Sequence, residues 1–281
     1  MSQPLHVPTL EEALRKLCSV KGTQAAEHIK PVHAYCGARL VVEGGFPPEW
    51  TNPRPPFASK KNTNLVSTLE HDPTMASAVE RPILGGIKSK DVDVSVVVPN
   101  IGPALGVSAK STGNAFRNLT NRMEEALGEC TNVHLMYPGF VFGFLHLIKF
   151  ARLSEVPKPD ASFDKEGEPL DAIKRYHDVL VALSGRMAIT DPAMRYEAVA
   201  LLVYTCDGQT AKLWPGFPPK ESPVHFLSFF QKLYDLYDLR YSYPAPQGQN
   251  ARKEWNVKGM DGNIQFDRSL KFPWGVRLAA D

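Results

Sequence analysis

The sequence has 281 residues, of which 43% are hydrophobic and 22% charged, which excludes a largely disordered chain. The formal net charge of +2 neither requires nor excludes a nucleic-acid partner, because local clustering of basic residues matters more than their total. The longest apolar run, residues 139–148, is too short to span a membrane. We therefore expect no membrane partner and a single domain over residues 1–281.

The cysteines and the N-terminus bear on the cellular compartment. The four cysteines are widely spaced and form no CxxC pair, so the pattern indicates neither a structural zinc site nor a disulfide framework. The first residues lack the basic start and the apolar stretch of a secretory signal. These features predict a reduced, cytoplasmic protein.

The N-terminal segment is expected to be helical. Thr9 and Glu12 have the spacing of a capping box, which predicts a helix through about residue 20. A second helical stretch runs from about residue 23 to residue 43, with Pro31 as a candidate break. Gly44 and Gly45 are typical of a helix C-terminus, and a proline-rich loop follows them.

The clearest strand signal lies in residues 91–98, which alternate in polarity and then become rich in valine. Residues 99–103 have turn composition, and residues 104–110 are predicted to form the returning strand of a hairpin. A helix is expected from residue 115 to about residue 127, closed by Gly128. Residues 132–137 and 141–150 then read as an apolar strand region.

The second half repeats the alternation of helices and strands. A polar, proline-containing loop is predicted at residues 154–169, and a helix from residue 170 to about residue 183. A strand at residues 197–205 turns into residues 210–213, and a helix rich in aromatic residues covers residues 224–239. This order predicts an α/β or α+β fold in which helices flank a central mixed sheet.

The hairpin places an acid beside a lysine. If its loop comprises residues 100–103, Asp93 lies directly opposite Lys110, and Ser108 shares the face of Lys110. On the next helix Glu124 lies beside a predicted apolar stripe, on a face that can return toward the hairpin. Two carboxylates and a lysine suit a hard divalent cation, for which Mg²⁺ is the expected cofactor.

This order of elements, with Asp93 and the run Ser108-Ala-Lys110, resembles the core of the PD-(D/E)xK nucleases over about residues 28–150. Ser108 departs from the usual acid at that position. It is similar in this respect to a branch of type II restriction endonucleases whose second acid lies on the following helix, which Glu124 matches. The resemblance also implies a contribution from Glu43, and it leaves residues 165–281 as an additional helix and strand region.

The resemblance implies a Mg²⁺-dependent, sequence-specific endonuclease that cuts double-stranded DNA to leave 5′-phosphates. Asp93, Glu124 and Glu43 would hold the metal, and Lys110 would serve the attacking water. Residues on the following helix would approach base edges, the candidates being Arg117, Asn118, Asn121 and Arg122. A palindromic target implies a homodimer.

Other readings of the same residues stay open. Asp91 competes with Asp93 as the metal ligand, and each is also compatible with an exposed acid at the start of a strand. Glu124 fits a solvated helix face, and Glu43 fits an ordinary helix end. The alternative functions are a repair, transposon or structure-specific nuclease of the same fold, a non-catalytic DNA-binding or interaction protein, and an unrelated metabolic enzyme.

Overall fold

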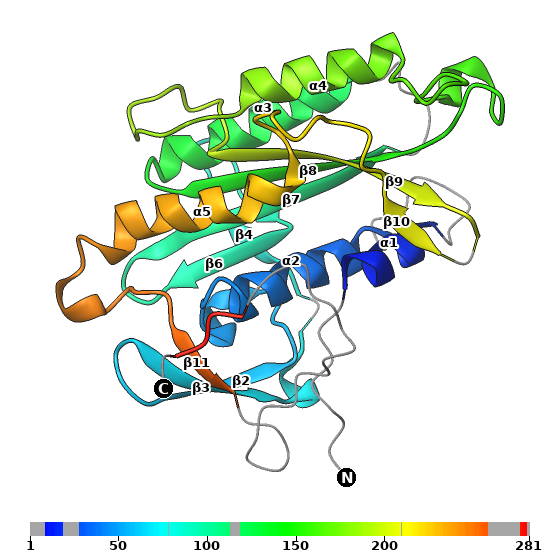
Figure 1. Ribbon diagram of the computed structural model, residues 1–281. Helices are drawn as coiled ribbons and strands as arrows, with labels where there is room; N and C mark the ends of the chain where they lie inside the picture. Colours follow the sequence, from blue (N-terminus) through cyan, green and yellow to red (C-terminus); the bar gives the residue numbers. More distant parts are fainter. Residues whose placement is uncertain are drawn as a thin grey trace.

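A six-stranded mixed sheet forms the centre of the computed structural model (Figure 1), which describes residues 9–18, 28–77, 79–112, 119–208, 210–257 and 276–279. The strand order is β1-β6-β7-β8-β9-β10. The β7, β8 and β9 strands are parallel, and the outer pairs are antiparallel. The strands of this sheet are β1 (Thr51–Asn52), β6 (Val94–Val98), β7 (Gly102–Thr112), β8 (Val141–Lys149), β9 (Ala198–Cys206) and β10 (Ala211–Leu213).

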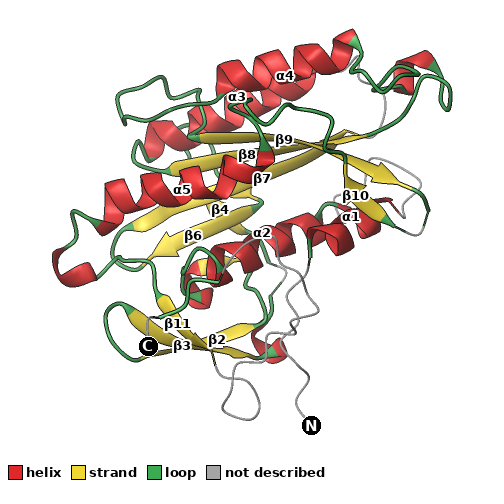
Figure 2. Cartoon of the chain, viewed as in Figure 1, coloured by secondary structure: helices red, strands yellow, loops and turns green. Residues whose placement is uncertain are grey.

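Helices cover both faces of this sheet (Figure 2). The apolar core on one face is built with α1, α2 and α5, and the core on the other face with α3 and α4. Parallel strands with both faces covered are expected to be apolar throughout, and residues 141–148 of β8 are all buried. The helices are α1 (Leu10–Cys18), α2 (Lys30–Val42), α3 (Leu119–Met136), α4 (Asp171–Leu183) and α5 (Phe229–Tyr237), which a π-helical turn (Asp238–Ser242) extends.

The α2 helix lies between the main sheet and a small sheet of order β11-β3-β2 (Figure 1). Its residues from Tyr35 to Val42 are all buried, as expected for a helix that is covered on opposite sides. The indole of Trp255 in β11 donates a hydrogen bond of 2.7 Å to the carbonyl of Val41. The strands outside the main sheet are β2 (Phe57–Lys61), β3 (Val66–His71), β4 (Arg81–Ile83), β5 (Lys90–Val92) and β11 (Glu254–Val257).

The mixed α/β class with a central sheet flanked by helices is confirmed. The capping box is present, with the Thr9 amide 2.9 Å from Glu12 Oε2 and the Glu12 amide 3.1 Å from Thr9 Oγ1. Pro31 does not break α2, because it lies in the first turn, where a helix tolerates proline. The predicted stop after α2 is also confirmed, since Gly45 has a φ of 74°.

The predicted end of α3 at Gly128 is wrong. The helix continues through Met136, so the strand expected at residues 132–137 is its last turns. Glycine lowers helix stability without forbidding a helix, and the buried apolar side chains continue beyond Gly128 with Cys130 and Val133, which belong to the same core as Ala126 before it. The start predicted at residue 115 lies outside the described residues.

The hairpin is confirmed, with a register two residues away from the predicted one. Val94 pairs with Val107 and Val96 with Leu105, and the pairing shifts again between Val96 and Val97. Side chains alternate between faces with a period of two, so the shift of two residues in the part of the hairpin from Val94 to Val96 keeps the side chains there on their predicted faces. Ser108, rather than Lys110, therefore comes closest to the position opposite Asp93.

The expectation of no disulfide is wrong for two of the four cysteines. Cys18 at the end of α1 is bonded to Cys206 at the end of β9, with Cα atoms 6.0 Å apart, while Cys36 and Cys130 are free and buried. Spacing in the sequence cannot reveal this pair, because 188 positions separate its members. Within the described part of the chain, none of the helices has the length and apolar character needed to cross a membrane.

Candidate functional site

Asp93 lies between β5 and β6, where its carboxylate lies near residues of both β7 and α2. One oxygen, Oδ2, accepts hydrogen bonds from the Ala109 amide at 2.8 Å, from Ser108 Oγ at 3.1 Å and from Lys110 Nζ at 3.1 Å. The other oxygen, Oδ1, lies 3.9 Å from Nε2 of His33 on α2. The two oxygens therefore have different roles, and Oδ1 is the one available to a ligand.

Lys110 pairs with Asp93 as the sequence predicted, although the two are not directly opposite in the hairpin. Burial opposes the charged form of Lys110, but the nearby carboxylates of Asp93 and Glu129 outweigh it and raise the pKa of the ammonium group. The side chain is therefore a fixed positive charge at neutral pH. It can stabilise an anion, and it is unsuited to remove a proton from water.

Glu129 of α3 is the second acid of this site. Its Oε2 accepts a hydrogen bond of 3.1 Å from Ser108 Oγ, which also contacts Asp93. The Oε1 atom lies 3.9 Å from Lys90 Nζ. Burial raises the pKa of the Glu129 carboxyl, and the positive charges of Lys110 and Lys90 offset this only in part. This carboxyl group therefore keeps its proton more readily than an exposed glutamate does.

His33, Glu80 and Asp93 form a group with the composition of a metal site. One ligand atom from each lies within 4.8 Å of the other two. His33 Nδ1 is 3.4 Å from Glu80 Oε1, yet neither ring nitrogen makes a hydrogen bond within the described part of the chain, although both are buried. Burial lowers the pKa of His33 despite the opposing charges of Asp93 and Glu80, so the ring is neutral at pH 7 and keeps a lone pair for a cation.

Two of the predicted metal ligands lie elsewhere. Glu124 is exposed on α3, and five positions around a helix turn it by about 140° from Glu129. Glu43 follows the last turn of α2, about 15 Å along the helix axis from His33. It is engaged by Arg39 at 2.5 Å and by Tyr234 Oη at 3.0 Å, so it stabilises the core instead of joining Asp93.

The other predicted site residues are exposed or outside the described chain. Asn121 and Arg122 are exposed near the start of α3, and Arg122 Nη1 lies 3.4 Å from Glu125 Oε2. Arg117 and Asn118 lie outside the described residues. Asp91 is exposed on β5, whereas Asp93 is buried against Lys110, so the geometry favours Asp93 as the site carboxylate.

Sequence reasoning missed His33, Glu80 and Glu129. Glu129 was hidden by the helix end assumed at Gly128; with the helix continued, it is an acid next to the apolar stripe of Ala126, Cys130 and Val133. His33 lies among apolar residues in the N-terminal half of α2, and a histidine in such a stretch could have been recognised as a candidate ligand. Glu80 lies in a loop, and no pattern in the sequence distinguishes it.

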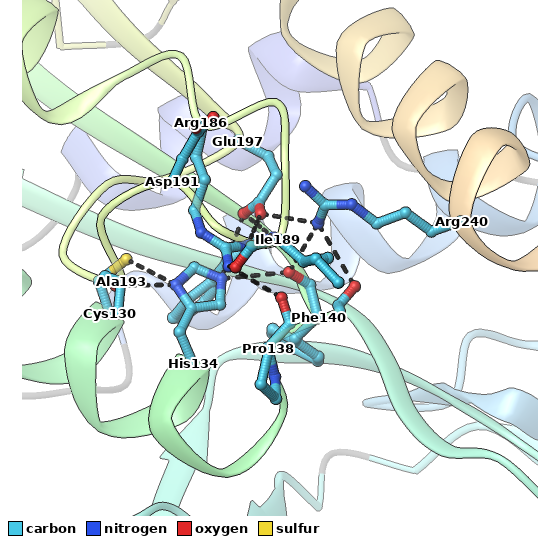
Figure 3. Close-up of polar contacts among 12 residues, drawn as sticks. Cys130, His134, Pro138, Phe140, Arg186, Ile189, Asp191, Ala193, Glu197 and Arg240 are labelled. Carbon is cyan, nitrogen blue, oxygen red and sulfur yellow. Dashed lines mark hydrogen bonds and ion pairs between the residues drawn. The ribbon is translucent and has the colours of Figure 1, made fainter.

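A second buried polar cluster centres on Glu197 (Figure 3). Its Oε1 accepts hydrogen bonds from Arg186 at 2.6 Å and Arg240 at 2.7 Å, and its Oε2 accepts one from the Phe142 amide at 2.8 Å. His134 Nε2 lies 3.3 Å from Oε2. Both carboxylate oxygens are thus occupied by protein groups, so this cluster ties loops to the sheet and is not a candidate for ligand binding.

Comparison with known proteins adds no assignment. No family model matches the chain, and no curated protein or solved structure is significantly similar to it. The candidate site therefore rests on the geometry of Asp93, Lys110, Glu129, His33 and Glu80.

Proposed function

We propose that this protein is a metal-dependent nuclease that hydrolyses phosphodiester bonds in DNA. The observation that carries the proposal is the double role of Asp93. Its Oδ2 is held by Lys110 and Ser108, while its Oδ1 faces His33 and Glu80. A positively charged lysine thus lies on one side of a carboxylate, and a set of candidate cation ligands lies on the other.

The donor set fits a divalent cation held by Asp93, Glu80 and His33. Two carboxylates suit Mg²⁺, the expected ion, and the imidazole also suits Mn²⁺. The buried ring nitrogens of His33, without hydrogen bonds in the described structure, are consistent with a missing partner. A bound cation would draw charge from a phosphate oxygen and make a nearby water more acidic.

The remaining residues have roles that follow from their charge. Lys110 neutralises negative charge that develops on the phosphate, because its ammonium group stays protonated. Glu129, with its raised pKa, is suited to hold or release a proton beside Lys110. Ser108 donates to a carboxylate and fixes the distance between Asp93 and Glu129.

The finer form of the proposal is a type II restriction endonuclease that cuts double-stranded DNA as a homodimer and leaves 5′-phosphates. Asn121 and Arg122 support it, because they are exposed at the start of the helix that follows the Lys110 strand. Amide and guanidinium groups there can read adenine and guanine in the major groove. Discrete plasmid fragments are the expected result, and a smear or a single nick would point to a structure-specific nuclease instead.

The test is cleavage of plasmid DNA with Mg²⁺ or Mn²⁺. Chelation should abolish cleavage and added metal should restore it, while Asp93→Asn and Lys110→Ala should each reduce the rate at least about a hundredfold. Circular dichroism and thermal unfolding of both variants check that the fold is intact. Wild-type activity in either folded variant would refute the assignment.

A non-catalytic DNA-binding protein is the second candidate. Ser108 favours it, because a serine stands where the related nuclease motif usually has a metal-binding acid. Calorimetry separates the two functions. Metal binding that is lost in Glu80→Gln supports the nuclease, whereas DNA affinity without any metal binding supports the second candidate.

A further inference from the structure

A cleft of about 910 Å³ opens beside the candidate metal group. Its walls come from α1, the start of α2, the turn at residues 53–56, and from Ala76, Ser77 and Glu80. His33 and Glu80 belong to both the cleft lining and the candidate metal group. A ligand in the cleft therefore lies next to two of the three residues of the candidate metal group, and Asp93 lies behind His33, with its Oδ1 3.9 Å from His33 Nε2.

The cleft carries more positive than negative charge. Its basic residues come from separate elements, Arg15 and Lys16 from α1, Lys30 from the start of α2 and Arg54 from the turn after β1. Among the described residues, two acids, Glu12 and Glu80, line it with them. Glu80 belongs to the metal group, so a bound cation would leave the cleft still more positive. Such an arrangement attracts a ligand with several negative charges.

Unsatisfied polar atoms indicate that the cleft is built for a ligand. His33 is 3% exposed, and neither of its buried ring nitrogens has a hydrogen-bond partner among the described residues. Arg54 also lines the cleft, and its Nε is likewise buried and without a hydrogen-bond partner in the described chain. Buried polar groups rarely lack a hydrogen bond, so two such groups in the lining of one cleft, of which His33 has the acids Glu80 and Asp93 near its ring nitrogens, point to an absent ligand.

We propose that this cleft holds the sugar–phosphate backbone of the DNA strand that is cut, with Lys30 and Arg54 contacting phosphates on either side of the metal group. The inference rests on the proposed nuclease function and names its substrate path. The rest of the lining from described residues is mainly proline and alanine, and His33 is the one aromatic ring among them, so this part of the cleft offers charge to phosphates and little surface for stacking bases. Its volume is typical of a site for a small organic molecule, so it accepts a short stretch of one strand and not a whole duplex.

The test is DNA binding in the presence of a chelator, so that no cleavage is needed. Lys30→Ala and Arg54→Ala are compared with Lys174→Ala, which removes an exposed lysine from α4 on the other face of the sheet. A single-stranded oligonucleotide and the duplex of the same sequence form the two arms. Each cleft variant should lower the slope of log affinity against log salt by about 0.7–0.9, the change for one lost phosphate contact. The Lys174 variant should bind as the wild type does.

The outcomes separate this inference from the proposed function. Weaker binding by the cleft variants in either arm supports the inference, even if the wild type shows no metal-dependent cleavage and the nuclease proposal fails. Wild-type affinity and salt dependence in the folded Lys30 variant, in both arms, would overturn the inference while leaving cleavage unaffected. Absence of DNA binding by the wild-type protein would overturn it as well.

Discussion

At the scale of single residues, the site depends on which side of Asp93 each partner occupies. Lys110 and Ser108 reach its Oδ2 from the strand, and His33 approaches its Oδ1 from α2. The sequence predicted the pairing of Asp93 with Lys110, because alternation along the strands places both on the same face. The resemblance implied Glu124 as the helix acid, whereas the acid that the structure places beside Ser108 is Glu129.

The structure makes opposite predictions for two glutamates of α3. Glu129→Gln should reduce metal-dependent cleavage at least about a hundredfold, since it removes a buried carboxyl that contacts Ser108 and lies near Lys110. Glu124→Gln is the matched control and should cleave at the wild-type rate, because its side chain is exposed. The cleavage rates of the two variants show which of the two glutamates is the functional acid. The reverse pattern would restore Glu124 as the functional acid.

Glu197 gives a prediction about pH. Burial opposes ionisation of this carboxyl, but hydrogen bonding and charge from His134, together with the charge of Arg240, outweigh it and lower the pKa below the ordinary 4.5. The ion pairs therefore contribute stability above about pH 4.5, and this contribution is lost as the pH falls through the folded-state pKa. Glu197→Gln should lower the free energy of unfolding by about 3–5 kcal/mol at pH 7, because it leaves buried arginines unpaired.

Urea unfolding across pH measures this difference. The deficit of Glu197→Gln relative to the wild type should shrink below about pH 4.5, because the protonated wild-type carboxyl then resembles the amide. A deficit that stays constant in acid would mean that the charge of Glu197 contributes nothing to stability.

At the scale of elements, composition and periodicity predicted the sheet better than the helix ends. The β6, β7, β8 and β9 strands were found because valine-rich and apolar runs have few other stable arrangements. The hairpin register was predicted two residues away, because Val98 already pairs with Gly102 at a turn shorter than the expected one, and because the irregularity between Val96 and Val97 has no signature in the sequence. Long-range features such as the disulfide and the contact of Glu80 with His33 depend on tertiary packing and could not be predicted.

Continuation of α3 past Gly128 can be tested by its effect on stability. A Cβ atom added at Gly128 would meet no atom within 4 Å, and alanine favours a helix interior, so Gly128→Ala should raise the free energy of unfolding by about 0.5–1 kcal/mol. Gly45→Ala is the contrasting control and should be destabilising, because Gly45 has a φ of 74° and its added Cβ would lie 2.2 Å from the carbonyl oxygen of Lys253. Chemical denaturation of both variants checks the prediction. Destabilisation by Gly128→Ala would indicate that the helix ends there.

At the scale of the whole molecule, the disulfide between Cys18 and Cys206 joins the first helix to the ninth strand of the chain. Cross-linking positions that are 188 residues apart restricts the unfolded chain strongly. Cys18→Ser should therefore lower the free energy of unfolding by about 2–4 kcal/mol under oxidising conditions. Under reducing conditions the variant and the wild type should have similar stability.

Counting thiols provides an independent check on that bond. Alkylation of the denatured wild type without reductant should modify only Cys36 and Cys130, and alkylation after reduction should modify all four cysteines. Four reactive thiols without reductant would show that the bond is absent.

The disulfide also bears on the cleft, because it holds the end of α1, and Arg15 and Lys16 of that helix line the cleft. One wall of the proposed strand path is thus covalently anchored to the end of β9, the strand next to the edge strand β10 of the central sheet. Thiol reagents in an assay buffer would release that anchor, so affinities measured with and without dithiothreitol describe two covalent forms of the protein and should be compared only within each form.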